Sequence, residues 1–166
     1  MFGLECRAVC AAHGAECGVK NMVTSEYAGD LSTAEAWSLL EKEPKAQLID
    51  VRTTAEWSFV GVPDLSSVGR DAFLVEWQSF PEMSVNPQFV DMVAKAVRKA
   101  GAAEDTPLLF LCRSGARSRA AAIAMTRAGF GKSYNIAGGF EGDLDERRHR
   151  GQRNGWKAQG LPWRQS

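Results

Sequence analysis

The sequence has no long hydrophobic run and no excess of charge of either sign. No apolar stretch approaches the roughly 18 residues that a membrane span requires, and the first residues lack the basic region and apolar stretch of a secretory signal. Twenty Lys and Arg residues balance twenty Asp and Glu residues, so no global field attracts nucleic acid or anionic lipid. We therefore expect a cytoplasmic protein with neither a nucleic-acid nor a membrane partner.

Cysteine is also scarce, because a chain of 166 residues contains only four. That number is too small for a disulfide scaffold, and a reducing compartment would leave the thiols free. Cys6, Cys10 and Cys17 crowd together with His13, without the paired spacing of structural zinc sites. We therefore expect no metal site, and we predict that residues 1–21 form a mobile extension.

Residues 22–166 are long enough and apolar enough to form one compact domain. The segments that predict helices are 32–44, 86–101 and 116–129, and those that predict buried strands are 47–51, 108–111 and 133–136. Alternation of strands and helices requires crossover connections, which produce a mostly parallel sheet. The sequence therefore predicts a three-layer α/β domain with helices on both faces of the sheet.

The start of the first two helices carries specific signals. Ser32 and Glu35 have the spacing of a capping box. Asn86 is the expected N-cap of the second helix, with Pro87 at its first helical position. Residues 58–85, which precede this helix, are rich in turn residues, and we expect them to be irregular.

The stretch LLFLCRSGARS, residues 108–118, sets a cysteine between a buried strand and a helix. Ligands of parallel sheets bind beyond the carboxyl ends of the strands, which is where Asp50, Cys112 and Gly138 all fall. Amides at the start of a helix have no intrahelical partner and stabilise an anion. A thiolate at Cys112 would be such an anion.

The residues after Cys112 add further stabilisation for a negative charge. They supply a glycine for a tight turn, hydroxyl donors and fixed positive charge: Arg113, Ser114, Gly115, Ala116, Arg117 and Ser118. We expect them to lower the pKa of the Cys112 thiol below its usual value of about 8.5. The alternative is a buried structural cysteine, which needs neither the glycine nor two arginines.

These motifs together resemble the single-domain rhodanese family. The resemblance rests on IDVR at 49–52, Glu56 and Trp57, CRSGARS at 112–118, NIAGG at 135–139 and GWKAQGLPW at 155–163. It implies an α/β sulfurtransferase in which Cys112 accepts a sulfane sulfur as a persulfide and passes it on. Asp50 and Arg52 match supporting positions, and we expect Arg52 to form an ion pair with Glu56.

The resemblance also implies the partners: a small anionic sulfur donor such as thiosulfate, a thiol or protein acceptor, and no cofactor. The chain departs from the family pattern at VGVPDL, residues 60–65, which lacks the usual histidine and second glycine of this segment. It also carries a charged insert at 140–154. That insert is either a solvated loop or a source of charge that steers an anionic substrate, through Arg147, Arg148, His149 or Arg150.

Three alternatives to a sulfurtransferase remain open. A phosphatase or arsenate reductase could use the same kind of loop, although such loops place five residues between cysteine and arginine, whereas Cys112 and Arg117 are separated by four. A rhodanese-like domain can also be a catalytically silent module that binds a partner, although the intact cysteine disfavours this. The last alternative is an unrelated α/β fold.

Overall fold

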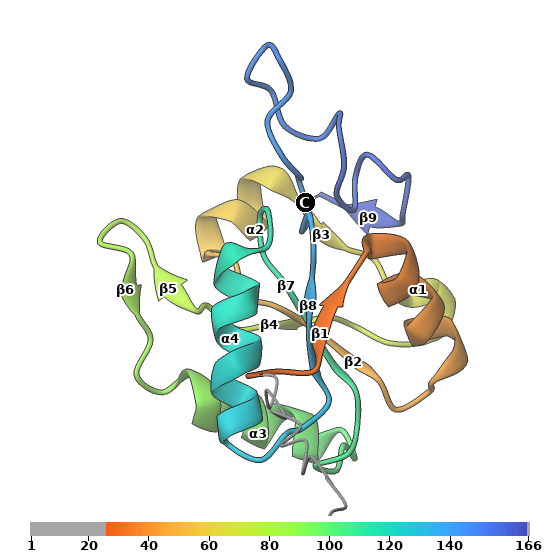
Figure 1. Ribbon diagram of the computed structural model, residues 1–166, viewed down its shortest axis with the longest axis vertical. Coiled ribbons are helices and arrows are strands. Elements are labelled where there is room, and N and C mark those ends of the chain that lie inside the picture. Colours follow the sequence, from red (N-terminus) through yellow and green to blue (C-terminus); the bar gives the residue numbers. More distant parts are fainter. Residues whose placement is uncertain (1–25, 166) are drawn as a thin grey trace, which may run out of the picture.

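Five parallel strands form the central sheet, in a computed structural model that describes residues 26–165. Across the sheet the strands are β1 (Gly29–Leu31), β8 (Ser133–Ile136), β7 (Leu108–Leu111), β2 (Gln47–Asp50) and β4 (Phe73–Leu74). Figure 1 shows this arrangement. The predicted α/β fold is confirmed, and all three predicted strands lie in this sheet.

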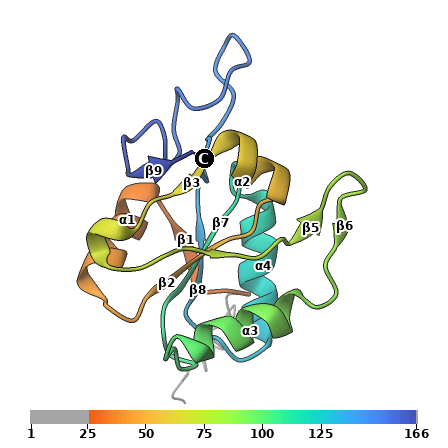
Figure 2. The same cartoon turned by 180° about the vertical axis from the view of Figure 1, so that it is seen from behind.

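Helices cover both faces of the sheet, as predicted (Figures 1 and 2). They are α1 (Thr33–Lys42) on one face and α3 (Phe89–Lys99) and α4 (Ala116–Arg127) on the other. Leu108 and Phe110 pack in the cluster that contains α3 and α4, whereas Leu109 and Leu111 pack in the cluster that contains α1. Each of these four side chains is 0% exposed, which explains why β7 is apolar throughout.

The segment 58–85 is more ordered than the sequence predicted. It contains the end of α2 (Thr54–Val60), β3 (Val62–Pro63), the short helical turn η1 (Ser66–Val68), β4, β5 (Gln78–Ser79) and β6 (Ser84–Val85). β3 pairs with β9 (Trp163–Arg164), and β5 pairs with β6 in a hairpin that projects from the domain (Figures 1 and 2). The prediction was wrong because strands of two residues show no detectable periodicity.

One of the two predicted helix starts is confirmed and the other is wrong. Ser32 and Glu35 form the complete capping box at the start of α1. The start of α3, in contrast, lies beyond Asn86, because Gln88 is the N-cap and Phe89 the first helical residue. The Asn86 side chain accepts a hydrogen bond from the Gln88 N–H at 3.0 Å. Asn86 therefore closes a turn before the helix rather than capping the helix itself.

A buried ion pair lies at the end of β2. Arg52 donates to both carboxylate oxygens of Asp50, with an Nη2–Oδ2 distance of 2.5 Å, and both side chains are 0% exposed. Its guanidinium also donates to the Gly61 carbonyl and stacks on the Phe140 ring, 4.0 Å from the ring centroid. The expected Arg52–Glu56 ion pair is therefore wrong. The carboxylate two residues away is close enough to hold the arginine in place.

Among residues 26–165, no helix is long and apolar enough to cross a membrane, and no cluster of His, Cys, Asp and Glu is arranged to hold a metal ion. The residues weighed as zinc ligands, Cys6, Cys10, His13 and Cys17, lie outside the described residues, as does the predicted extension 1–21.

The buried pair predicts a large loss of stability when only its cation is removed. In Arg52→Met, the Asp50 carboxylate loses its partner while it remains buried, and we expect the free energy of unfolding to fall by about 3–5 kcal/mol. Urea denaturation measures this change. As a control, Arg127→Met removes the cation of an exposed pair with Glu26 and should change stability by less than about 1 kcal/mol. Equal effects of the two substitutions would contradict the prediction.

Candidate active site

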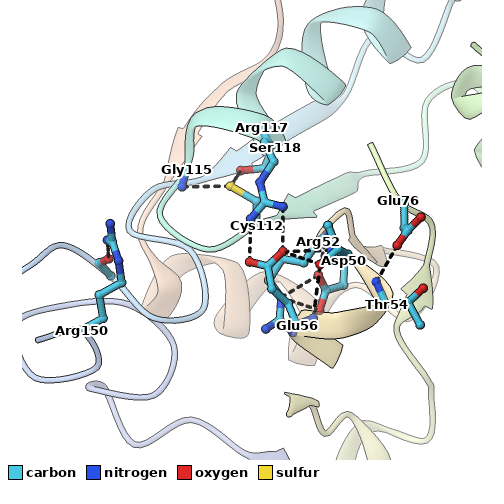
Figure 3. Close-up of polar contacts among 12 residues, drawn as sticks. Asp50, Arg52, Thr54, Glu56, Glu76, Cys112, Gly115, Arg117, Ser118 and Arg150 are labelled. Atoms are coloured by element: carbon cyan, nitrogen blue, oxygen red, sulfur yellow. Dashed lines mark hydrogen bonds and ion pairs between the residues drawn. The ribbon is translucent and has the colours of Figure 1, made fainter. Parts of the chain in front are cut away.

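Cys112 directly follows β7 and lies in the loop that leads into α4. The residue is buried, with 1% of its surface exposed. The Gly115 N–H donates a hydrogen bond to the Cys112 sulfur, and the Ser118 hydroxyl lies close to the same sulfur, each at 3.1 Å (Figure 3). Gly115 has a φ of +115°, a conformation that favours glycine. The loop thus directs a backbone donor at the sulfur, as its position before a helix predicts.

A chain of polar side chains extends from the sulfur across the sheet to β1. The Ser118 hydroxyl lies 2.6 Å from Asn135 Oδ1 on β8. The Asn135 amide in turn donates to Asp30 Oδ1 at 2.8 Å, and the Tyr27 hydroxyl donates to the same oxygen at 2.7 Å. The hydrogen bond from Asn135 holds the pKa of Asp30 below its ordinary value, against the opposing effect of burial. Asp30 is therefore a carboxylate that keeps the Asn135 carbonyl directed at Ser118.

The single proton of Ser118 links this chain to the charge on the sulfur. When Cys112 is a thiol, Ser118 can donate to Asn135 while the S–H group faces the serine oxygen. When Cys112 is a thiolate, Ser118 donates its proton to the sulfur. The Asn135 carbonyl oxygen then lies 2.6 Å from the Ser118 oxygen with no proton between them. Asn135 and the Cys112 thiolate therefore compete for one proton.

Arg117 is held by Glu56, a residue of α2 that lies 61 positions earlier in the chain. Two hydrogen bonds of 2.7 Å join the guanidinium to the two carboxylate oxygens. The same carboxylate completes a capping box with Thr53 at the start of α2. Although burial opposes ionisation, the hydrogen bonds from Arg117 and Thr53 lower the pKa of Glu56 from 4.5 to about 2. The charge of Arg117 is thus balanced within the site rather than left free for a ligand.

The turn after β8 packs directly against the cysteine loop. The Phe140 N–H donates to the Cys112 carbonyl at 2.8 Å, and the Glu141 N–H donates to the Arg113 carbonyl at 2.9 Å. Gly139 has a φ of +58°, and a Cβ atom at this position would overlap the carbonyl oxygen of Cys112. The two backbone segments therefore approach each other without an intervening side chain.

A cavity of about 240 Å³ opens over the cysteine loop. Loop residues Cys112, Arg113, Ser114, Ala116 and Arg117 form one side of it, and Gln78 and Met83 of the β5–β6 hairpin form the other. The hairpin is thus a wall of the site. It also restricts access to the sulfur from that side.

The structure brings most of the predicted residues together. All seven loop residues from Cys112 to Ser118 surround the sulfur or the cavity above it, and the Asp50–Arg52 pair lies at the end of the adjacent strand. Of the charged insert, Arg150 lines a second cavity that borders the site, whereas Arg147 and His149 line a different hollow.

Sequence reasoning missed Asn135, Asp30, Gln78 and Met83 as members of the site. Asn135 left a signal, because a polar residue at a buried position of the strand 133–136 requires a polar partner. The two hairpin residues left none, since they lie in a segment without periodicity.

Comparison with known proteins identifies relatives of the whole described domain. Residues 28–166 match the family described as the STR4 middle domain. The uncharacterized protein RP600 of Rickettsia prowazekii is 34% identical over 134 residues, which are 81% of this chain and 95% of that protein. The thiosulfate sulfurtransferase GlpE of Actinobacillus pleuropneumoniae is 27% identical over 138 residues, which are 83% of this chain and 94% of that protein.

A solved structure matches at higher identity. The crystal structure of Rv0390 from M. tuberculosis superimposes with a TM-score of 0.73 at 48% sequence identity, over 84% of this chain and 99% of that one. The similarity therefore extends over nearly all of the known structure and most of this chain.

The Glu56–Arg117 pair predicts a specific dependence of stability on pH. A carboxylate with a lowered pKa stabilises the fold fully above its unfolded pKa, near 4.5, and loses this effect as the pH falls to about 2. We expect Glu56→Gln to lower the free energy of unfolding by about 1–3 kcal/mol at pH 6, and by progressively less as the pH falls below 4.5. Urea denaturation at several pH values measures the difference. Glu26→Gln, in an exposed pair, should show no such trend.

The competition for the Ser118 proton predicts that Asn135→Ala makes Cys112 more reactive. Without the asparagine carbonyl, Ser118 donates to the thiolate at all times. One hydrogen bond of about 1 kcal/mol, partly offset by the lower nucleophilicity of a hydrogen-bonded thiolate, corresponds to a roughly twofold to threefold faster alkylation by iodoacetamide near neutral pH. Ser118→Ala should slow alkylation, because the donor is lost. Ser133→Ala, whose hydroxyl donates to the Phe130 carbonyl away from the loop, is the control. A slower reaction in Asn135→Ala would rule out the competition.

Proposed function

Because this chain belongs to the rhodanese-like family, as its motifs, its fold and its match to the STR4 middle domain establish, we propose that it is a sulfurtransferase that carries a sulfane sulfur on Cys112. The observation that carries the proposal is the pair of donors, Gly115 N–H and Ser118 hydroxyl, each 3.1 Å from the cysteine sulfur. A structural cysteine would need neither donor.

The first step loads the sulfur. The Cys112 thiolate attacks the outer sulfur of a donor such as thiosulfate, a new S–S bond forms, and the S–SO₃ bond breaks so that sulfite leaves with the electron pair. No external oxidant or reductant is consumed. The amides at the start of α4 stabilise the negative charge as it moves along the three sulfur atoms. Arg113, which lines the cavity over the loop, supplies positive charge for the anionic donor.

The second step unloads the sulfur. An acceptor thiolate, or cyanide, attacks the terminal sulfur of the persulfide, and the bond between that sulfur and Cys112 Sγ breaks. Cys112 leaves as a thiolate, stabilised by the same two donors as before. Covalent catalysis of this kind in two half-reactions predicts ping-pong kinetics.

The phosphatase alternative is less well supported by the geometry. A phosphate-binding loop relies on an arginine whose charge is available to the oxyanion. In this loop Arg117 is engaged by Glu56 through both of its terminal nitrogens. A phosphate dianion would therefore meet a charge that is already balanced.

The proposal predicts that the wild-type protein gains the mass of one sulfur atom when it is incubated with thiosulfate. Cyanide should remove this mass and yield thiocyanate. Cys112→Ser should gain no mass and produce thiocyanate at least about a thousandfold more slowly, because a hydroxyl is not ionised near neutral pH. Intact-protein mass spectrometry and a colorimetric thiocyanate assay measure the two effects, and circular dichroism verifies that the variant is folded. Persulfide formation in Cys112→Ser would disprove the assignment.

A second enzyme assay tests the phosphatase alternative. We expect hydrolysis of a generic aryl phosphate by the wild-type protein to remain at the background rate. Brisk hydrolysis together with resistance to thiosulfate would favour the phosphatase in place of the sulfurtransferase.

A further inference from the structure

Two cavities adjoin at the cysteine loop, and they differ in size. The cavity over Cys112 has a volume of about 240 Å³, and its neighbour has a volume of about 540 Å³. Met83, Arg113 and Arg117 line both, so the two are direct neighbours. The smaller cavity suffices for thiosulfate or cyanide. The larger cavity has a volume typical of pockets that bind organic molecules, which are much larger than thiosulfate or cyanide.

The larger cavity combines apolar walls with two arginines, Arg113 and Arg150, that form no ion pair among the described residues. Val60 of α2 and Phe80 and Met83 of the β5–β6 hairpin supply the apolar surface. Phe80 is 67% exposed, so it has apolar area to bury against a ligand. This hairpin residue lies on the rim of the site, where a bound molecule could cover it.

The charges around the larger cavity favour an anion. Glu56 neutralises Arg117, and the remaining charged residues of the lining are Arg113, Arg150 and Glu141. Arg150 is held in place by a hydrogen bond from its Nη1 to the Gly142 carbonyl, at 2.5 Å. Figure 3 shows Arg150 well apart from Cys112. A ligand that reaches both Arg150 and the sulfur must therefore be extended.

We propose that the larger cavity binds the sulfur acceptor, and that this acceptor is an extended organic thiol with a carboxylate for Arg150 and an apolar group for Phe80 and Met83. The inference rests on the proposed function, of which it specifies the second half-reaction. The acceptor thiolate attacks the terminal sulfur of the Cys112 persulfide and leaves as a persulfide itself, while Cys112 is released as a thiolate. One S–S bond breaks and one forms, so electrons and charge balance without a further reactant.

Short peptide thiols provide the test. The persulfide form of the protein is prepared with thiosulfate, and its reaction with N-acetyl-Cys-Phe, with the C-terminal amide of that peptide, and with N-acetyl-Cys-Gly is followed by intact mass. In these peptides a further residue separates the carboxylate from the thiol. We expect the Cys-Phe carboxylate to react about tenfold faster, at low concentration, than either the amide or the Cys-Gly peptide. The rate of the reaction with cyanide should not depend on the larger cavity. Equal rates for all three peptides would overturn the proposal.

Matched variants assign each preference to its residue. Arg150→Gln should remove the preference for the carboxylate over the amide, whereas Arg147→Gln, in the same insert but outside this cavity, should retain it. Phe80→Ala should remove the preference for Cys-Phe over Cys-Gly, whereas Phe59→Ala, an exposed aromatic that does not line the cavity, should retain it. The two control variants, Arg147→Gln and Phe59→Ala, should react with cyanide as the wild type does. Loss of a preference in the control variants alone would refute the assignment.

A binding measurement separates this inference from the proposed function. N-acetyl-Ser-Phe has no thiol and cannot accept sulfur, yet it retains the carboxylate and the aromatic ring. Calorimetric titration of Cys112→Ser with this peptide and with its amide tests the cavity without any sulfur transfer. A roughly tenfold tighter binding of the carboxylate supports the inference even if thiosulfate never loads the protein. Absence of binding overturns it even if thiosulfate does load the wild-type cysteine.

Discussion

The contact between two backbone turns, one after β7 and one after β8, determines the geometry of the site. Gly139 leaves no room for a side chain against the carbonyl of Cys112, and the Phe140 N–H donates to that carbonyl at 2.8 Å. Because β7 and β8 are neighbours in the sheet, the turns that follow them meet at the same edge. The cysteine loop is thereby held by main-chain atoms, which have few alternative conformations.

The same contact connects the loop to the ion pair at the end of β2. Phe140, fixed by its hydrogen bond to the cysteine loop, presents its ring to the guanidinium of Arg52. Arg52 in turn binds Asp50 and the carbonyl of Gly61 at the end of α2. The ends of three strands and one helix are thus joined by a continuous set of short contacts.

Much of the fold and the centre of the site could be predicted from the sequence, because their signals are local. The apolar run of β7, the glycine of the loop and the helix formers of α4 lie within twenty consecutive residues, and each supports the same structure. The partner of Arg117 could not be predicted, because Glu56 lies 61 positions away and Arg52 is a nearer cation. Which arginine meets which carboxylate depends on how α2 packs against the loop, and no local pattern records that packing.

The walls of the site were beyond prediction for a different reason. The β5–β6 hairpin consists of two-residue strands, so its conformation depends on turns and on tertiary contacts rather than on hydrophobic periodicity. Asn135 is intermediate between these cases. Its polarity within a buried strand indicated a partner, but Ser118 and Asp30 could be identified only once β1, β8 and α4 were placed together.

The hairpin residues from Gln78 to Val85 belong to neither apolar cluster of the core. Substitutions of these hairpin residues therefore cost little folding free energy. Substitutions around Gly139, in contrast, disturb the cysteine loop, because the two backbone segments are in direct contact. The hairpin wall of the cavity can thus diverge more freely during evolution than the wall formed by the cysteine loop. A domain built in this way can change the molecules that it admits while its reacting sulfur, and the backbone that holds it, stay the same.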